Sequence, residues 1–100
     1  MIRHVVMWKF KEMGEGKTKV ENLDIVRDKL FALLPIIPEL KKMEIGKDVL
    51  HTDASYDLVL ITEFENLDDL HTYAVHPEHL NVAGYVRNVT ESRVVLDCEI

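Results

Sequence analysis

The residues best suited to chemistry in this chain fall within seven positions, Tyr73-Ala-Val-His-Pro-Glu-His79. A neutral His79 imidazole could take a proton from a substrate carbon, while the Tyr73 phenol donates to a developing enolate oxygen. We therefore interpret His79 and Tyr73 as a candidate acid–base pair. The structural alternative is that His79 hydrogen-bonds across a turn and Tyr73 is half-buried with its hydroxyl in water.

Pro77 determines how this stretch folds. It has no N–H group and disfavours helical geometry at His76, but it suits the first position of a new helix. The sequence therefore predicts two helical pieces joined by an elbow, with His76 as an N-cap or structural donor. The change of direction at the elbow would bring Tyr73 and His79 over one opening. The helix N-terminus would disfavour a protonated His79 and leave it available as a base.

A third candidate, His4, lies in the first patterned segment. It alternates with Val6 and Trp8, so its side chain is expected on a largely apolar face. It is either a satisfied core histidine or the group that orients a polar substrate atom. Trp8 is expected to pack in the core. The two remaining histidines, His51 and His71, are expected to be solvated.

Four potential metal ligands cluster near the elbow: His71, His76, Glu78 and His79. They lack the HExxH spacing, and Pro77 interrupts the helix that would align them. We predict no specific metal site. No glycine-rich phosphate loop or serine nucleophile elbow is present, and no cofactor is predicted.

Composition limits the class of protein. One hundred residues predict a single domain over 1–100. Eighteen acidic and twelve scattered basic residues give a net charge of −6, which does not favour a nucleic-acid partner. One cysteine, Cys98, fits a reducing compartment, and no run approaches the ~18 apolar residues of a membrane span. The N-terminus leads directly into a patterned segment, without a signal peptide. We expect a soluble, cytoplasmic protein without membrane association.

Hydrophobic periodicity predicts elements in the order βαββαβ. They are a strand over Ile2 to Phe10, a polar loop over Lys11 to Lys17, a helix from about Thr18 through Leu34, strands over Leu40 to Val49 and Tyr56 to Phe64, the two helical pieces from Asn66, and a strand over Arg93 to Ile100. Thr18 and Glu21 match a capping box, and Gly46 is expected at a bulge or bend. The predicted class is α+β: a ferredoxin-like protomer with a four-stranded antiparallel sheet.

Helices in this arrangement cover only one face of the sheet. The first, third and last strands carry apolar residues on both faces, most clearly at Leu58-Val59-Leu60-Ile61. An uncovered apolar face forfeits many kcal/mol at ~25 cal/mol per Å². We therefore predict a homodimer joined sheet to sheet.

The chain resembles a known family. The residues that carry the resemblance are Arg3-His-Val-Val-Met-Trp-Lys-Phe-Lys11, Ile37-Pro38, Gly46-Lys-Asp48, Tyr56-Asp-Leu-Val-Leu60 and Tyr73-x-x-His-Pro-x-His79. In this order, across nearly the whole chain, they are similar to the stress-responsive dimeric α/β-barrel (Dabb) domains. The resemblance implies a βαββαβ protomer that closes a dimeric α/β barrel with a second subunit.

The resemblance also bears on the site. One plant branch of the family is a polyketide cyclase that performs an intramolecular aldol condensation with a tyrosine and a histidine. Its motif matches Tyr73 and His79, and its first-strand histidine matches His4. A further cavity histidine of that branch falls near Leu58, which has no ionisable group.

Two functions from different classes remain open. The first is a homodimer like the stress-associated members of the family, either non-catalytic or weakly binding a small apolar molecule. The second is a cofactor-free cyclase, isomerase or monooxygenase acting on a small apolar or aromatic substrate through His79, Tyr73 and His4. A cavity of ~300 Å³ or more where the three residues converge favours the enzyme. Filling of that space by Trp8 and Phe64 favours the binding or structural role.

Overall fold

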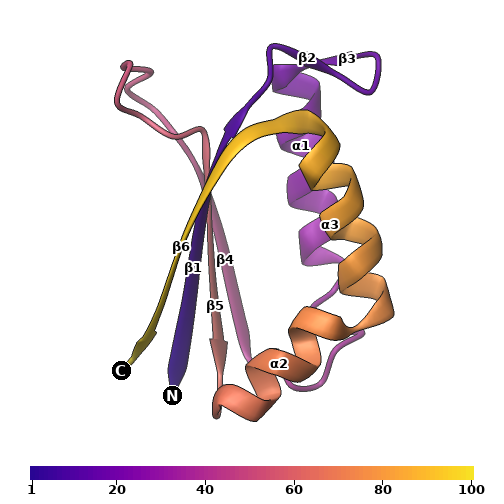
Figure 1. The fold of residues 1–100 in the computed structure, drawn as a ribbon, viewed down its shortest axis with the longest axis vertical. Coiled ribbons are helices and arrows are strands. Elements are labelled where there is room, and N and C mark those ends of the chain that lie inside the picture. Colours follow the sequence, from indigo (N-terminus) through magenta and orange to yellow (C-terminus); the bar gives the residue numbers. More distant parts are fainter.

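The computed structural model describes residues 1–100 as a four-stranded antiparallel sheet with three helices on one of its faces (Figure 1). The strand order is β4-β5-β1-β6, the split-βαβ order of a ferredoxin-like protomer. The predicted α+β class is confirmed. The elements are β1 (Ile2–Phe10), β2 (Met13–Gly14), β3 (Lys17–Thr18), α1 (Lys19–Phe31), β4 (Lys42–Lys47), β5 (Leu58–Phe64), α2 (Leu67–Val75), α3 (Pro77–Val89) and β6 (Thr90–Glu99).

Alternation along β5 separates the two faces of the sheet. Its even-numbered residues, from Leu58 to Phe64, are buried beneath the helices, while Val59, Ile61 and Glu63 lie on the other face and are partly exposed. β1 follows the same rule, with Val6 1% exposed and Met7 38%. Residues two apart share a face because the side-chain period of a strand is two. The helix-covered face therefore holds the core.

The segment between β1 and α1 departs from the prediction. It was expected to be an irregular polar loop, but it contains the short β2–β3 hairpin. The two residues at its tip, Glu15 and Gly16, both have positive φ, as tight two-residue hairpin turns often require. α1 follows at once, and the predicted capping box between Thr18 and Glu21 is present.

α1 ends earlier than predicted, at Phe31 rather than near Leu34. Pro35 explains the position, because a proline removes the hydrogen bond to the carbonyl four residues earlier, which is that of Phe31. The chain continues in turns that still direct Leu33 into the core, while Leu34 is 39% exposed. Val20 at the start of α1 is 70% exposed, so it does not belong to the buried face of the helix.

The elbow between α2 and α3 forms as predicted. The Asn66 side chain caps α2 by accepting from the Asp69 N–H (2.8 Å). His76 ends α2 in extended geometry (ψ 134°) and begins α3, where its Nδ1 accepts from the Glu78 N–H (3.1 Å). Pro77 occupies the first turn of α3. The N-cap role predicted for His76 is confirmed.

Strand boundaries and Gly46 need small corrections. β4 and β5 are shorter than predicted, whereas β6 begins earlier, at Thr90. The expected bulge at Gly46 is absent, because its register with β5 is continuous. Gly46 instead allows a close approach: a Cβ there would lie 3.2 Å from Cγ1 of Val59.

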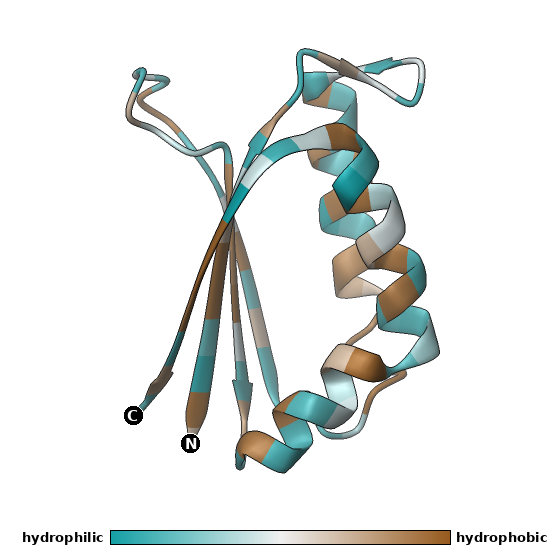
Figure 2. Ribbon diagram, in the orientation of Figure 1, coloured by the Kyte–Doolittle hydropathy of each residue, from teal (hydrophilic) through white to brown (hydrophobic).

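One face of the sheet has no helix on it (Figure 1). Hydropathy colouring shows long apolar stretches in β1 and β6 (Figure 2). Register places six apolar residues on this open face: Val5, Met7, Val59, Ile61, Val94 and Leu96. We call these six residues the open-face patch.

None of the helices is long and apolar enough to span a membrane.

Candidate functional site

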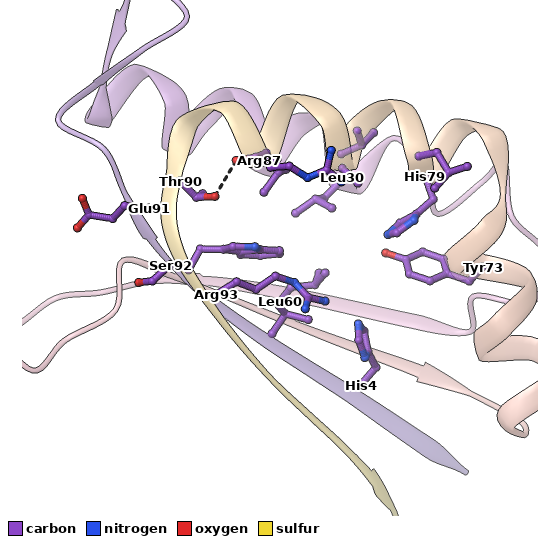
Figure 3. A pocket seen from close by; sticks show the side chains of 16 residues that line it. His4, Leu30, Leu60, Tyr73, His79, Arg87, Thr90, Glu91, Ser92 and Arg93 are labelled. Atoms are coloured by element: carbon purple, nitrogen blue, oxygen red, sulfur yellow. Dashed lines mark hydrogen bonds between the residues drawn. The ribbon is translucent and has the colours of Figure 1, made fainter.

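A cavity of ≈ 600 Å³ lies between α3 and the helix-covered face of β1 and β6. Its walls are mostly apolar, with Leu60 at its base and Ala83 among the residues of α3. His4, Tyr73 and His79 all line it (Figure 3). The structure therefore brings together the three residues singled out by the sequence. Trp8 forms part of the wall without filling the space, and Phe64 packs behind Tyr73.

The elbow sets the geometry of Tyr73 and His79. Tyr73 is in the last turn of α2 and His79 in the first turn of α3, and their ring centroids are 4.3 Å apart at a 49° tilt. Phe64 contacts the other side of Tyr73, with centroids 5.1 Å apart. These contacts hold the phenol between β5 and α3, and the catalytic roles remain a prediction.

His79 has a structural hydrogen bond and a free ring nitrogen. Its Nδ1 lies 3.0 Å from the carbonyl oxygen of Ala74, which can only accept, so Nδ1 carries the proton. The lone pair of the neutral ring is then on Nε2. Burial lowers the pKa of His79 from its ordinary 6.5, and the nearby His4, Arg93 and His76 lower it further. His79 thus makes the hydrogen bond across the turn that a structural role requires. It also has the free Nε2 lone pair and the lowered pKa that a base requires.

Tyr73 differs from its structural alternative. The alternative placed its hydroxyl in water, but the side chain is 1% exposed and the hydroxyl has no hydrogen-bond partner in the chain. Burial raises the pKa of Tyr73 to about 12, so the phenol stays protonated. Figure 3 shows the hydroxyl directed toward the cavity. A buried donor without a partner is costly, which makes it a candidate contact for a ligand oxygen.

His4 is held by a residue that the sequence analysis missed. Its Nδ1 forms a hydrogen bond with the Asp97 carboxylate of β6, directly opposite in the sheet register. A carboxylate on one ring nitrogen fixes the orientation and the tautomer of the imidazole. Asp97 therefore holds the His4 side chain in place.

Two arginines at the cavity were also missed. Arg87 comes from α3 and Arg93 from β6, where it is opposite Trp8. A sequence signal existed: Arg93 and Asp97 share one face of the last strand with Val95, because their numbers differ by multiples of two. Only the strand register shows that this face points toward the cavity. No group of three or more potential metal ligands is found at the cavity or elsewhere.

Comparisons with known proteins identify the family. The family model described as the stress responsive A/B barrel domain (Dabb) matches residues 2–100. The chain belongs to the Dabb family. This Dabb protein is 26% identical to olivetolic acid cyclase of Cannabis sativa over 98 residues, which are 96% of this chain and 93% of that protein.

Solved structures with this fold include dimeric proteins of unknown function. One, from Bacteroides fragilis, is 29% identical with a TM-score of 0.78, over 99% of this Dabb chain and 95% of that one. Another, from Thermobifida fusca, has a TM-score of 0.84 at 23% identity, over 99% and 90% of the two chains, and shows the fold alone. These two neighbours of the Dabb protein are thus dimeric ferredoxin-like proteins of unknown function.

Proposed function

We propose that this Dabb protein is a homodimer that binds a small, mainly apolar molecule in the cavity beneath α3. The convergence of His4, Tyr73 and His79 on one cavity of ≈ 600 Å³ carries the proposal. Ligand sites of this kind have volumes of about 300–1,000 Å³, apolar walls and a few convergent polar groups. The unpartnered Tyr73 hydroxyl is one such group.

A neutral fluorescent probe, N-phenyl-naphthylamine, tests the binding directly. We expect saturable binding with enhanced, blue-shifted emission. Ala83→Trp places a large side chain in the cavity wall and should abolish this binding. Gly84→Ala is the matched control on the same helix, because its new Cβ meets nothing within 4 Å. Absence of saturable binding to the native protein, or equal binding by Ala83→Trp, would overturn the proposed cavity function.

Acid–base catalysis is the second candidate, favoured by the protonation pattern at the elbow. His79 donates Nδ1–H to Ala74 and keeps a lone pair on Nε2, while Tyr73 keeps its proton. This pair suits enolisation of a ketone. The α-carbon proton moves to Nε2, the C–H electron pair forms the enolate double bond, and the oxygen accepts a hydrogen bond from Tyr73. The identity to a plant cyclase supports this candidate.

Exchange of α-hydrogen for deuterium in acetonaphthone, followed by NMR in heavy water, tests this chemistry. We expect exchange above the buffer rate. His79→Gln should reduce the enzymatic rate by about 10²–10⁴-fold, the usual contribution of a general base. Tyr73→Phe should slow exchange while the probe still binds. A native exchange rate equal to buffer leaves binding without catalysis as the function.

The open-face patch is the proposed dimer interface. It lies on the face opposite the helices, and apolar patches of this extent seldom remain exposed to water. Dimeric relatives support self-association. We propose that two sheets pack through this patch and close a barrel.

The free Cys98 fits a reducing compartment, so we also propose a cytoplasmic location.

A further inference from the structure

We propose that Arg93, with Arg87 on the opposite wall, anchors a carboxylate, so that the cavity selects small apolar carboxylic acids over their neutral analogues. The inference deepens the proposed function and rests on it. It gives the ligand a class, an apolar body with one anionic end, and gives each end a defined place in the cavity.

The two arginines approach the cavity from different elements. Arg93 extends from β6 and Arg87 from α3 on opposite walls of the cavity, with their guanidinium groups directed away from Ser92 and Thr90 (Figure 3). Tyr73 and His79 lie beyond the arginines, at the end of the cavity away from Ser92 and Thr90 (Figure 3). A ligand with its apolar part over Trp8 and Leu60 would thus have its charged end beside the guanidinium groups.

The absence of an ion pair distinguishes these two exposed arginines from the other two in the chain. The chain has four arginines, and the other two are paired: Arg3 with Glu63 at 2.9 Å, and Arg27 with Asp24 and Asp28 at 3.5 and 3.3 Å. Arg87 and Arg93 form no ion pair or side-chain hydrogen bond. They remain unpaired although acidic residues outnumber basic ones by eighteen to twelve.

The acidic groups nearest the cavity do not neutralise the arginines. Asp97 is paired with His4, and Glu91 points away from the cavity (Figure 3). The only side-chain hydrogen bond among the lining residues joins the Thr90 hydroxyl to the Val86 carbonyl oxygen (2.8 Å). The guanidinium groups of Arg87 and Arg93 are therefore left without an acceptor in the protein.

The donor chemistry favours a carboxylate. A guanidinium presents parallel N–H groups that match the two oxygens of a carboxylate. Phosphate sites typically add backbone N–H groups from a glycine-rich loop or a helix N-terminus. The end of the cavity near Thr90 has the C-terminal end of α3 instead. The helix dipole there does not favour an anion, so the arginines must supply the attraction.

The experiment compares naphthoate with its neutral isostere naphthamide, both competing with N-phenyl-naphthylamine. We expect the native protein to bind naphthoate about tenfold more tightly, the effect of a charge-assisted hydrogen bond. Arg93→Gln should remove most of this preference and leave naphthamide binding unchanged. Arg93→Lys should retain part of it. Arg27→Gln is the control with the same change in net charge, and it should keep the full preference.

The outcomes separate this inference from the proposed function. If the neutral probe binds but naphthoate and naphthamide compete equally, the carboxylate site is wrong and the cavity function stands. If Arg93→Gln weakens both competitors alike, Arg93 is only part of the wall, and the inference also fails. Failure of the neutral probe itself overturns the proposed function. Sedimentation of Arg93→Gln should show an unchanged dimer, since a shift to monomer would assign Arg93 to the interface instead.

Discussion

At the residue scale, Tyr73 is placed at a cost to stability. Its ring is packed between Phe64 and His79, but its hydroxyl is buried without a partner in the chain. Such a group costs about 1–3 kcal/mol, and functional sites commonly contain groups of this kind. The unpartnered hydroxyl is the observation that supports the proposed ligand contact.

Tyr73→Phe should therefore stabilise the unliganded protein. Removing the unpartnered hydroxyl while keeping the ring should raise the free energy of unfolding by about 1 kcal/mol. Urea unfolding followed by circular dichroism measures the change. Tyr85→Phe is the control, because the Tyr85 hydroxyl donates to Asn22 (2.7 Å) and its loss should destabilise the protein. A destabilised Tyr73→Phe would mean that the hydroxyl is satisfied in solution.

His79 should make stability depend on pH. Burial lowers its pKa in the folded protein below the 6.5 of the unfolded chain, so the unfolded state binds more protons at acidic pH. The stability present above pH 6.5 is therefore lost as the pH falls through the folded pKa of His79. Urea unfolding at successive pH values should show a smaller loss in His79→Gln. The exposed His71, changed to Gln, should leave the loss as in the native protein.

At the element scale, the elbow between α2 and α3 creates the site. His76 ends one helix and caps the next, while Pro77 fixes the first turn of α3. Without the change of direction, Tyr73 and His79 would be six positions apart on one continuous helix, on different faces of its surface. The elbow brings their rings into contact.

His76→Ala should weaken the elbow. It removes the side chain that accepts from the Glu78 N–H, and losing an N-cap costs about 1 kcal/mol. His76→Asn should restore most of the stability, because asparagine is a favoured N-cap. Thermal unfolding of the two variants measures the difference, and we expect probe binding to weaken only in His76→Ala. Equal melting temperatures for both variants would contradict the capping role.

At the scale of the whole molecule, the two faces of β5 distinguish folding from assembly. Leu60 is 2% exposed beneath the helices, whereas the neighbouring Val59 belongs to the open-face patch. A lone buried carboxylate costs several kcal/mol. At position 60 this cost destabilises the folded protomer, whereas at position 59 it destabilises the dimer. Adjacent substitutions can thus separate the two processes.

Leu60→Asp should unfold the chain, while Val59→Asp should give a folded monomer. Sedimentation at micromolar concentration should show twice 11.6 kDa for the native protein and 11.6 kDa for Val59→Asp, with circular dichroism reporting the fold. A native protein that sediments as a folded monomer would refute the dimer. A dimeric Val59→Asp would place the interface elsewhere.

The sequence alone determined the features that depend on local physics. Alternation in β1 and β5, the capping box at Thr18 and the proline at position 77 each act within a few residues, so the βαββαβ order and the elbow could be predicted. Tyr73 and His79 could be paired for the same reason. The end of α1 was predicted three residues too late, near Leu34. Pro35 cannot donate a hydrogen bond to the Phe31 carbonyl, and it also disfavours helical geometry at Leu34.

Only the tertiary structure decided how distant strands meet. Asp97 is 93 positions from His4, and Arg93 is opposite Trp8, because β6 pairs with β1 in one particular register. A shift of one residue would turn Arg93 and Asp97 to the open face, and nothing local to either strand fixes that choice. The cavity and its free arginines follow from this pairing, since packing of α3 over the sheet determines the space that remains between them.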